Sequence, residues 1–533
     1  MGSQRVLERR RRFPVLGAMV ALGTAGVLAL MFSGCGGGSS TVATPAPPAP
    51  AVQPLEIADV QQIVQAALNS ANVDMVVAVV DRAGFVLAVF RTQHAPATAV
   101  GNFSATVNAN DLAVALARTG AFFSNDQAPL SSRTVRFISG IHFPAGVMNQ
   151  PPADLYGIEN TNRGCALVND PAFLAQIPPS SSLAGGFGLG VITGKKDAVD
   201  SDPNAVNPGG IPIFYQNVVL GGIGVVTSSS NLNIAEYAAL AGATTERGSA
   251  GDHFGPTPAA PGVVAIGGIN LPFVQQTTLP AGLSAGPVAG NGSFLVPPSN
   301  SAGQPPDGDL IPPAAGPLGG LSSAEVQQIL NNAEAEANLT RAAIRLPIGS
   351  RARMVISVAD LDGTILGLRR MPDATIFSVD VAASKARNMV YFNGPNRLPI
   401  DLNQVPMGTA VTNRTISFAA QPLFPPGIDG TSPGPFFNLY PMDIANPCTQ
   451  GFQSGAPNDK KSGIVFFPGS VGLYRNGALV GGLGVSGDGV DEDDFVTSAG
   501  TVGFEAPTAI RADQITINGV RLPYFKFPRN PTD

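Results

Sequence analysis

The sequence predicts an α+β protein with two tandem domains, each an antiparallel sheet flanked by helices. The first observation is a repeat: segment 207–225 ends in Gly-Gly-Ile-Gly-Val, and segment 467–485 ends in Gly-Gly-Leu-Gly-Val at the same distance from a Pro-Gly pair. The second is that both copies order their patterns as helix, hairpin, helix, hairpin, helix. A repeat this long indicates duplicated domains rather than a solenoid, and hairpins separated by helices favour antiparallel sheets covered by helices.

Further matches between the copies set the domain boundaries. The first unit covers residues 55–275 and the second unit covers residues 321–526. Both lengths are near the usual size of a single domain. Residues 276–320 are dense in Pro and Gly and almost uncharged, which predicts a flexible linker. Residues 527–533 form a short tail.

Each unit begins with an amphipathic helix and a strand hairpin. In the second unit Ser322 and Glu325 stand three residues apart before an apolar helical pattern, which is a capping box. Runs of β-branched residues follow, and short turns containing Asp and Gly join them into hairpins. The predicted elements are helix 59–71 with strands 75–80 and 85–90 in the first unit, and strands 354–359 and 364–369 in the second.

The other half of each unit adds two helices around a second hairpin. The hairpin of the second unit turns at Asn476-Gly477, a strong type I′ signal. The Gly-Gly-x-Gly-Val strand lacks the Lys-Ser/Thr of a phosphate loop, so we expect its glycines to let a helix approach the sheet closely. The predicted elements are helices 110–123, 379–392, 234–243 and 493–504, and strands 211–215 and 218–226.

Residues 1–35 have the pattern of an export signal. A basic run at 9–12 precedes an uncharged apolar stretch at 15–32, and small residues stand before Cys35. The pattern is similar to a bacterial lipoprotein signal, which predicts that Cys35 is lipidated and that the protein lies in the cell envelope, at the outer membrane or in the periplasm. The alternative is a transmembrane anchor, because about 18 apolar residues can span a bilayer. Residues 36–54 predict a disordered Gly/Pro tether.

The charge of the chain argues against nucleic acid and anionic lipid as partners. Residues 1–34 hold five Arg and one Glu, and the remainder has 26 basic and 36 acidic side chains, a net charge of −10. Nucleic-acid binding needs clustered cationic charge. We therefore expect the protein to contact the membrane through its lipid anchor alone.

Several of these segments together resemble the GlcG/HbpS family of haem-binding-protein-like domains. The second unit keeps the family pattern of a strand ending in Val-x-Asp-x-x-Gly, a strand ending in Arg, a helix with Lys-Ala, a Pro-Gly loop and a downstream acid; the matching residues are Asp360, Gly363, Arg370, Lys385-Ala386, Pro468-Gly469 and Asp494. The first unit departs from the pattern, with Leu116 at the lysine position and Glu236 at the acid. The resemblance implies a profilin-like fold and makes the second unit the expected binding copy.

The resemblance also implies a ligand, haem or another tetrapyrrole, and candidate ligand-binding residues. Those candidates are Lys385, Arg370, Asp360 and Asp494. Lys385 is the single cation on the apolar side of its helix, where it pairs with Asp360 or Asp494, holds a ligand carboxylate, or extends its charged end to solvent. For Arg370 a structural ion pair is the first expectation and ligand contact the second.

Haem iron needs an axial ligand, commonly His. The chain has three His, and His94, just after the second strand, is the best candidate by position. The other two are His142 and His253, and a loop His is often merely solvated. The acids at 488–494 lack the spacing of a calcium loop, so we expect a solvated acidic face at a helix N-terminus.

Cys165 and Cys448 occupy matching places in the long irregular segments. In an oxidising compartment they either form a disulfide between the units or remain two small buried residues. We expect the units to pack as an intramolecular pseudo-dimer.

The leading functional hypothesis is a lipid-anchored, extracytoplasmic tandem binding protein for haem or a similar small hydrophobic acid. The alternatives are an enzyme that acts on tetrapyrroles or small organic acids, and a structural pseudo-dimer without a ligand. The sequence shows no nucleophile paired with a base, so the prediction favours binding over catalysis.

Overall fold

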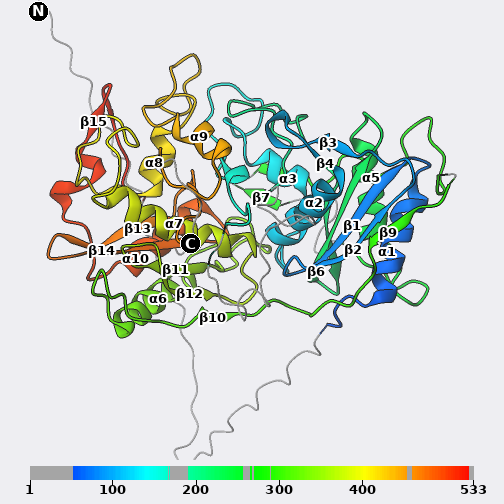
Figure 1. Ribbon diagram of the computed structural model, residues 1–533, viewed down its shortest axis with the longest axis horizontal. Helices are drawn as coiled ribbons and strands as arrows, with labels where there is room; N and C mark the ends of the chain where they lie inside the picture. The colour runs from blue at the N-terminus through cyan, green and yellow to red at the C-terminus, as the bar shows by residue number, and fades with distance from the viewer. Residues whose placement is uncertain are drawn as a thin grey trace, which may run out of the picture. The chain divides into compact units, whose positions relative to one another are not determined.

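The computed structural model describes residues 52–165, 167, 190–255, 264–266, 269–288, 290–452 and 459–526. The expected signal, the lipidation residue Cys35, the tail and the tether up to residue 51 therefore lie outside the described residues. Each unit contains a five-stranded antiparallel sheet with helices against it, as the sequence predicts (Figure 1). In the described part of the chain, no helix has both the length and the apolar character needed to cross a membrane.

The strand order is the same in both sheets. It is β5-β6-β1-β2-β9 in the first unit and β13-β14-β11-β12-β10 in the second. The elements of the first unit around its sheet are α1 (Ile57–Ser70), β1 (Met75–Asp81), β2 (Val86–Arg91), α2 (Ala109–Phe123), β5 (Gly210–Tyr215), β6 (Val218–Thr227) and α5 (Asn233–Ala243). Those of the second are α6 (Ser323–Ala337), β11 (Val355–Ala359), β12 (Ile365–Arg370), α7 (Phe377–Asn393), β13 (Ser470–Arg475), β14 (Ala478–Ser486) and α10 (Val490–Gly500).

Helices cover both faces of the first sheet, and the side chains of β1 alternate between them. Val76, Ala78 and Val80 pack with residues of α2, while Val77 and Val79 pack with residues of α1 and α5. A strand buried on both faces is apolar at every position rather than at every second one. This explains the continuous Met-Val-Val-Ala-Val-Val run.

Two local sequence signals have the predicted structure. Ser322 and Glu325 form the capping box at the start of α6. Asn476 and Gly477 both have positive φ, at 53° and 81°, as a type I′ turn requires. At Gly224 and Gly484 an added Cβ would overlap a carbonyl oxygen of the helix above, so these glycines do allow close approach of helix and sheet.

The prediction of a flexible linker at 276–320 is wrong in part. Strand β9 (Ser293–Val296) pairs with β2, and strand β10 (Gly308–Ile311) pairs with β12. The linker thus supplies an edge strand to each sheet. The physical reason is that β2 and β12 would otherwise expose unpaired N–H and C=O groups, which a neighbouring extended segment satisfies.

Shorter elements complete the units. In the first unit they are the hairpin β3 (Thr98–Val100) and β4 (Thr106–Asn108), helices η1 (Asn102–Ser104), α3 (Ser132–Phe137) and η2 (Ile158–Asn160), and the pair β7 (Val264–Ile266) and β8 (Ile269–Leu271). In the second they are helices α8 (Asn413–Ala419), α9 (Leu439–Ala445), η3 (Thr508–Ile510) and η4 (Ala512–Gln514), and the pair β15 (Thr516–Ile517) and β16 (Val520–Arg521).

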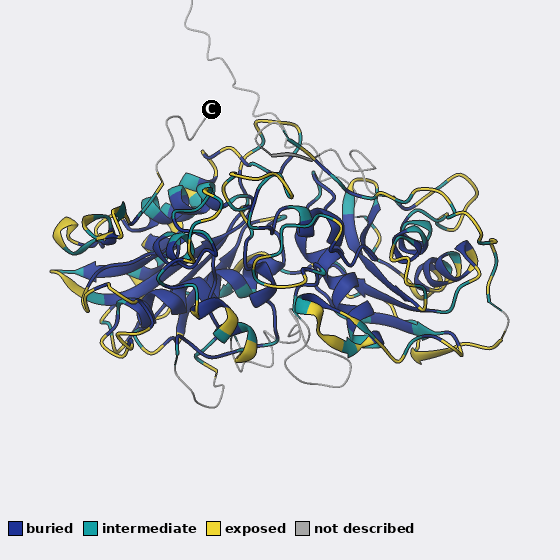
Figure 2. Cartoon of the chain, turned by 90° about the horizontal axis from the view of Figure 1, so that it is seen from above, coloured by how far each residue is buried: buried dark blue, intermediate teal, exposed yellow. Residues whose placement is uncertain are grey.

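Helices α2 and α7 are buried on nearly all sides because each contacts the opposite unit as well as its own sheet. The rings of Phe123 and Phe377 stack with 4.1 Å between their centroids. The Ile376 N–H donates to the Phe122 carbonyl at 3.1 Å. In Figure 2 the strands of both sheets are mostly buried, and exposed residues gather in loops and outer helix faces.

The turn carboxylate Asp81 predicts a pH dependence of stability. Asp81 is buried, and burial raises its pKa to about 6 despite the N–H groups that it accepts. The folded state therefore keeps this proton to a higher pH than the unfolded chain, and stability falls as pH rises from about 4 to about 6. Across that window we expect the free energy of unfolding of the wild-type protein to fall by about 2–3 kcal/mol more than that of Asp81→Asn. Denaturant unfolding at both pH values measures this difference. Equal pH slopes for wild type and Asp81→Asn would contradict the prediction.

Candidate functional site

Lys385, the first candidate, lies on α7 with no exposed surface. Its Nζ donates to Asp493 Oδ2 at 2.8 Å and to the Val485 carbonyl at 2.7 Å, and it lies 4.9 Å from the centre of the Phe467 ring. Of the alternatives that the sequence left open, an ion pair is present, but its acid is Asp493 rather than Asp360 or Asp494. Helix α10 begins at Val490 rather than near 493, and this places Asp493 opposite the lysine.

Three acids around the start of α10, Asp488, Asp493 and Asp494, are buried and partnered rather than solvated, which corrects the expected acidic surface. Asp494 accepts hydrogen bonds from the Arg414 Nε and from the Lys526 N–H. Asp488 accepts from the Arg345 Nε. A buried carboxylate is tolerated only where a cation or N–H groups compensate its lost hydration.

Burial controls the protonation of this cluster. It raises the pKa of Asp493, outweighing the opposing effect of Lys385, and it lowers the pKa of Lys385. One oxygen in each of Asp488, Asp493 and Asp494 is buried without a hydrogen-bond partner. Burying these carboxylates therefore costs free energy, and the neighbouring cations offset part of that cost.

The space beside the Lys385–Asp493 pair is small. A cavity of ≈ 30 Å³ lies there, lined by residues of both units that include Phe123, Phe377, Phe467 and Asp493. Such a volume holds about one water, whereas ligand pockets usually measure about 300–1,000 Å³. The second unit, the expected binding copy, is therefore closed at its family lysine.

The first unit has a large cavity at the equivalent place. Its volume is ≈ 520 Å³, and its apolar wall includes Val100, Leu112, Leu116, Val226 and Ala235. The cavity also borders Lys196, whose side chain is 60% exposed and whose Nζ lies 3.2 Å from Asp202 Oδ2. This is a ligand-sized, mainly apolar space, and Lys196 is the one charged residue among its described lining residues.

Thr227, at the end of β6, also lines this cavity and was missed from the sequence. It is 8% exposed, and its Oγ1 is buried without a hydrogen-bond partner. Its only sequence signal was the Val-Thr pair standing where the second unit has Ser-Gly.

Arg370 and Asp360 hold the linker and do not line any of the cavities described here. Arg370 donates to the backbone carbonyls of Ala374, Pro305 and Pro306, and burial lowers its pKa to about 9. Asp360 accepts from the N–H groups of Leu318 and Gly319 at 3.1 and 2.7 Å. These contacts fix the end of β12 and the linker, so the structure gives both residues a structural role.

The three His residues lie outside the two cavities described above and outside a third, of ≈ 510 Å³, between the units. His94 is exposed, with its N–H directed to Asp74 Oδ1 at 3.3 Å. His142 Nε2 lies 2.7 Å from Asp429 Oδ1 of the other unit, and His253 is exposed. The lining residues of the three cavities include no His, Cys, Met or Tyr. Apolar walls and volume suit a porphyrin, but these cavities offer iron no axial side chain.

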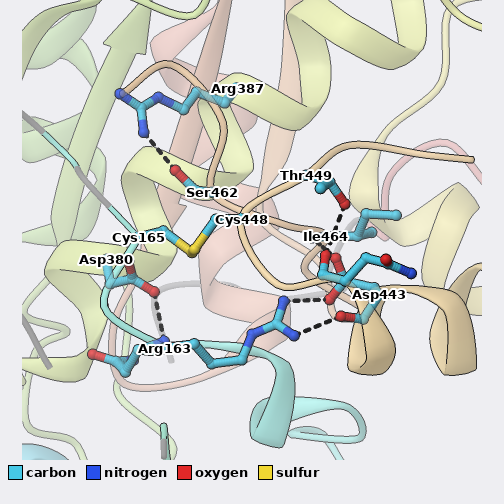
Figure 3. Close-up of a disulfide and its surroundings, with 11 residues drawn as sticks. Arg163, Cys165, Asp380, Arg387, Asp443, Cys448, Thr449, Ser462 and Ile464 are labelled. Atoms are coloured by element: carbon cyan, nitrogen blue, oxygen red, sulfur yellow. Dashed lines mark hydrogen bonds and ion pairs between the residues drawn. A yellow bond between two sulfur atoms is a disulfide. The ribbon is translucent and has the colours of Figure 1, made fainter. Parts of the chain in front are cut away.

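Cys165 and Cys448 form a disulfide between the units, with 5.2 Å between their Cα atoms. Beside it, Arg163 Nη2 lies 2.6 Å from Asp443 Oδ2 (Figure 3). Asn160 donates to the same carboxylate at 2.8 Å. Burial raises the pKa of Asp443 to about 6 in spite of Arg163. The disulfide thus lies within a buried polar contact between the units.

The second unit is similar to a known family. Residues 321–501 match the family model described as haem degrading protein HbpS-like. The matched segment includes both residues of the Lys385–Asp493 pair and helix α10.

Two curated relatives are corrinoid adenosyltransferases named PduO, from Salmonella typhimurium and Citrobacter freundii. Each is 28% identical over 155 residues, which is 29% of this chain and 33% of the relative. The chain thus spans about a third of the length of these relatives.

Two solved structures are also similar. One is a PduOC:haem complex, with 24% identity, 35% of this chain and 97% of that chain covered, and a TM-score of 0.23. The other is the Klebsiella pneumoniae protein ORFY, with 23% identity, coverages of 34% and 90%, and a TM-score of 0.22.

Proposed function

We propose that this protein is an extracytoplasmic, lipid-anchored binding protein for haem or a similar small hydrophobic acid, and that the cavity of the first unit is its binding site. The observation that carries the proposal is the ≈ 520 Å³ cavity with apolar walls and Lys196 at its surface. Burial of apolar ligand surface supplies affinity, and a lysine complements a carboxylate. The HbpS-like match of the second unit supports a haem-related ligand class.

The described lining residues offer iron no axial side chain, so the test compares a metal-free porphyrin with haemin. If apolar contact and Lys196 hold the ligand, iron adds little, and metal-free protoporphyrin should bind within about threefold of haemin. Protoporphyrin fluorescence measures binding directly, with haemin as competitor, and the absence of Trp from the chain keeps protein emission low. We expect one site per chain.

Ala235→Phe should weaken binding by at least about tenfold because the ring occupies the cavity. Leu240→Phe is the matched control, since it adds the same ring to helix α5 but is not among the lining residues. Equal affinity of the two variants would contradict the site.

No binding of either porphyrin to the wild-type protein would reject haem as the ligand. Loss of the Soret band with reductant would instead favour the enzyme hypothesis.

The two units are proposed to form an intramolecular pseudo-dimer. Equivalent residues approach each other in pairs, Cys165 with Cys448 and Asn160 with Asp443. Such self-contacts are expected close to a twofold axis.

The envelope location is proposed from the signal-like sequence before Cys35. Mass spectrometry of the protein purified from membranes should find a lipid on Cys35, and fractionation should place it at the outer membrane. An unmodified Cys35 in the exported protein would reject the anchor.

A further inference from the structure

At equivalent positions the two units have side chains of different chemical character. In the second unit Gly469 faces Asp493, and Gly484 faces Lys385. In the first unit Gly209 faces Ala235 in the same way, and Leu116 is the residue at the lysine position of α2. A buried ion pair is thus replaced by two apolar side chains.

A third charge is lost at the same place. Asp488, which pairs with Arg345, stands in the sequence where the first unit has Ser228. Ser228 lines the large cavity. The inner part of the cavity therefore has no charged group among its described lining residues, where the second unit has a closed charged network.

The apolar residues at the replaced positions and the charged residue of the cavity differ in exposure. Leu116 and Ala235 are 1% and 4% exposed, whereas Lys196 has a side chain 60% exposed. Thr227 is buried, and its Oγ1 lacks a partner. Rotation about its Cα–Cβ bond can turn this hydroxyl toward a bound ligand, which would satisfy it.

From this arrangement we infer that the ligand binds with an uncharged end innermost, against Leu116 and Ala235, and with its carboxylates at Lys196. The cavity selects acids whose charges all lie at one end and whose other end is apolar or bears a neutral hydroxyl that reaches Thr227. Leu116 is the specificity-determining residue, because a charge at the inner end would be buried without a partner. This inference rests on the proposed function, in that the cavity binds an acid.

Three naphthalene acids of similar size test the inference by intrinsic ligand fluorescence or calorimetry. These are 2-naphthoate, 6-hydroxy-2-naphthoate and naphthalene-2,6-dicarboxylate. We expect the dicarboxylate to bind at least about tenfold more weakly than 2-naphthoate, since its second charge is buried. The hydroxy acid should bind about fivefold more tightly than 2-naphthoate, and Thr227→Val should remove that advantage while 2-naphthoate binding stays the same.

Leu116→Lys should reverse the order and favour the dicarboxylate, whereas Leu116→Met, of similar length and without charge, should keep the wild-type order. If Leu116→Lys fails to fold, the wild-type series and Thr227→Val still decide the question. Equal affinities of the mono- and dicarboxylate for the wild-type protein, or no binding of any of the three, would overturn the inference. The expected order together with no porphyrin binding would reject haem and leave the inference standing.

Discussion

Replacing Cys165 and Cys448 with alanine should lower the free energy of unfolding by about 4–5 kcal/mol. The bond joins residues 283 positions apart. In the chain-entropy account, a cross-link that closes so long a loop removes much of the freedom of the unfolded chain. Alanine is preferred to serine because both cysteines are buried, at 7% and 1% exposure. Denaturant unfolding monitored by circular dichroism measures the loss.

A reductant provides the control for this prediction. It should destabilise the wild-type protein by about the same amount as the double substitution and leave the double variant unchanged. If the variant and the oxidised wild type unfold at the same denaturant concentration, the bond does not stabilise the fold. The other contacts between the units, such as the stacked pair Phe123–Phe377 and the ion pair Arg163–Asp443, remain in the variant. We therefore expect native circular dichroism without denaturant.

Most of the correctly predicted fold features come from local sequence patterns, because these features depend on interactions between residues close in sequence. The capping box at Ser322 and the turn at Asn476-Gly477 are of this kind. The start of α10 was missed, since Gly489 and Val490 give no capping signal and the helix was expected to begin at the acids. The edge strands β9 and β10 were also missed, because pairing with distant strands, and not their own composition, makes them extended.

The candidate site shows a different limit of sequence reasoning. Lys385 stood out as a cation on an apolar helix face, and it is buried as that pattern suggests. The acid that pairs with Lys385 depends on how α10 is rotated relative to the sheet. The sequence does not determine that rotation to within one residue. The change to Leu116 was interpreted as loss of a binding role. In three dimensions Leu116 and Ala235, which stand in place of the ion pair, line a ligand-sized cavity.

Lys385→Leu should destabilise the protein by about 3–5 kcal/mol, and adding Asp493→Ala should recover a large part of that loss. Alone, the first substitution leaves Asp493 buried with no cation in its pair, and one of its oxygens already lacks a partner. Burial raises the pKa of Asp493, so the single variant keeps it protonated when folded. A carboxyl group protonated in the folded state and ionised in the unfolded state makes stability fall as pH rises. Because the pKa of Asp493 is already raised to about 7 beside Lys385 and rises further without the lysine, the deficit of the single variant relative to wild type should grow as pH rises above about 7.

The double variant reproduces in the second unit the Leu and Ala that the first unit contains at the equivalent positions. Unfolding curves of both variants and of the wild-type protein give the coupling between the two side chains. If the double variant is less stable than the single variant by the full cost of a second, independent substitution, the pair is not coupled. Removal of both charged side chains should also enlarge the ≈ 30 Å³ cavity. Leu has nearly the volume of Lys, and Ala is only slightly smaller than Asp, so the enlarged cavity stays far below the size of a ligand pocket. We therefore expect the stoichiometry for 2-naphthoate to remain one per chain. A second bound 2-naphthoate in a folded double variant would mean that the ion pair alone closes the second unit.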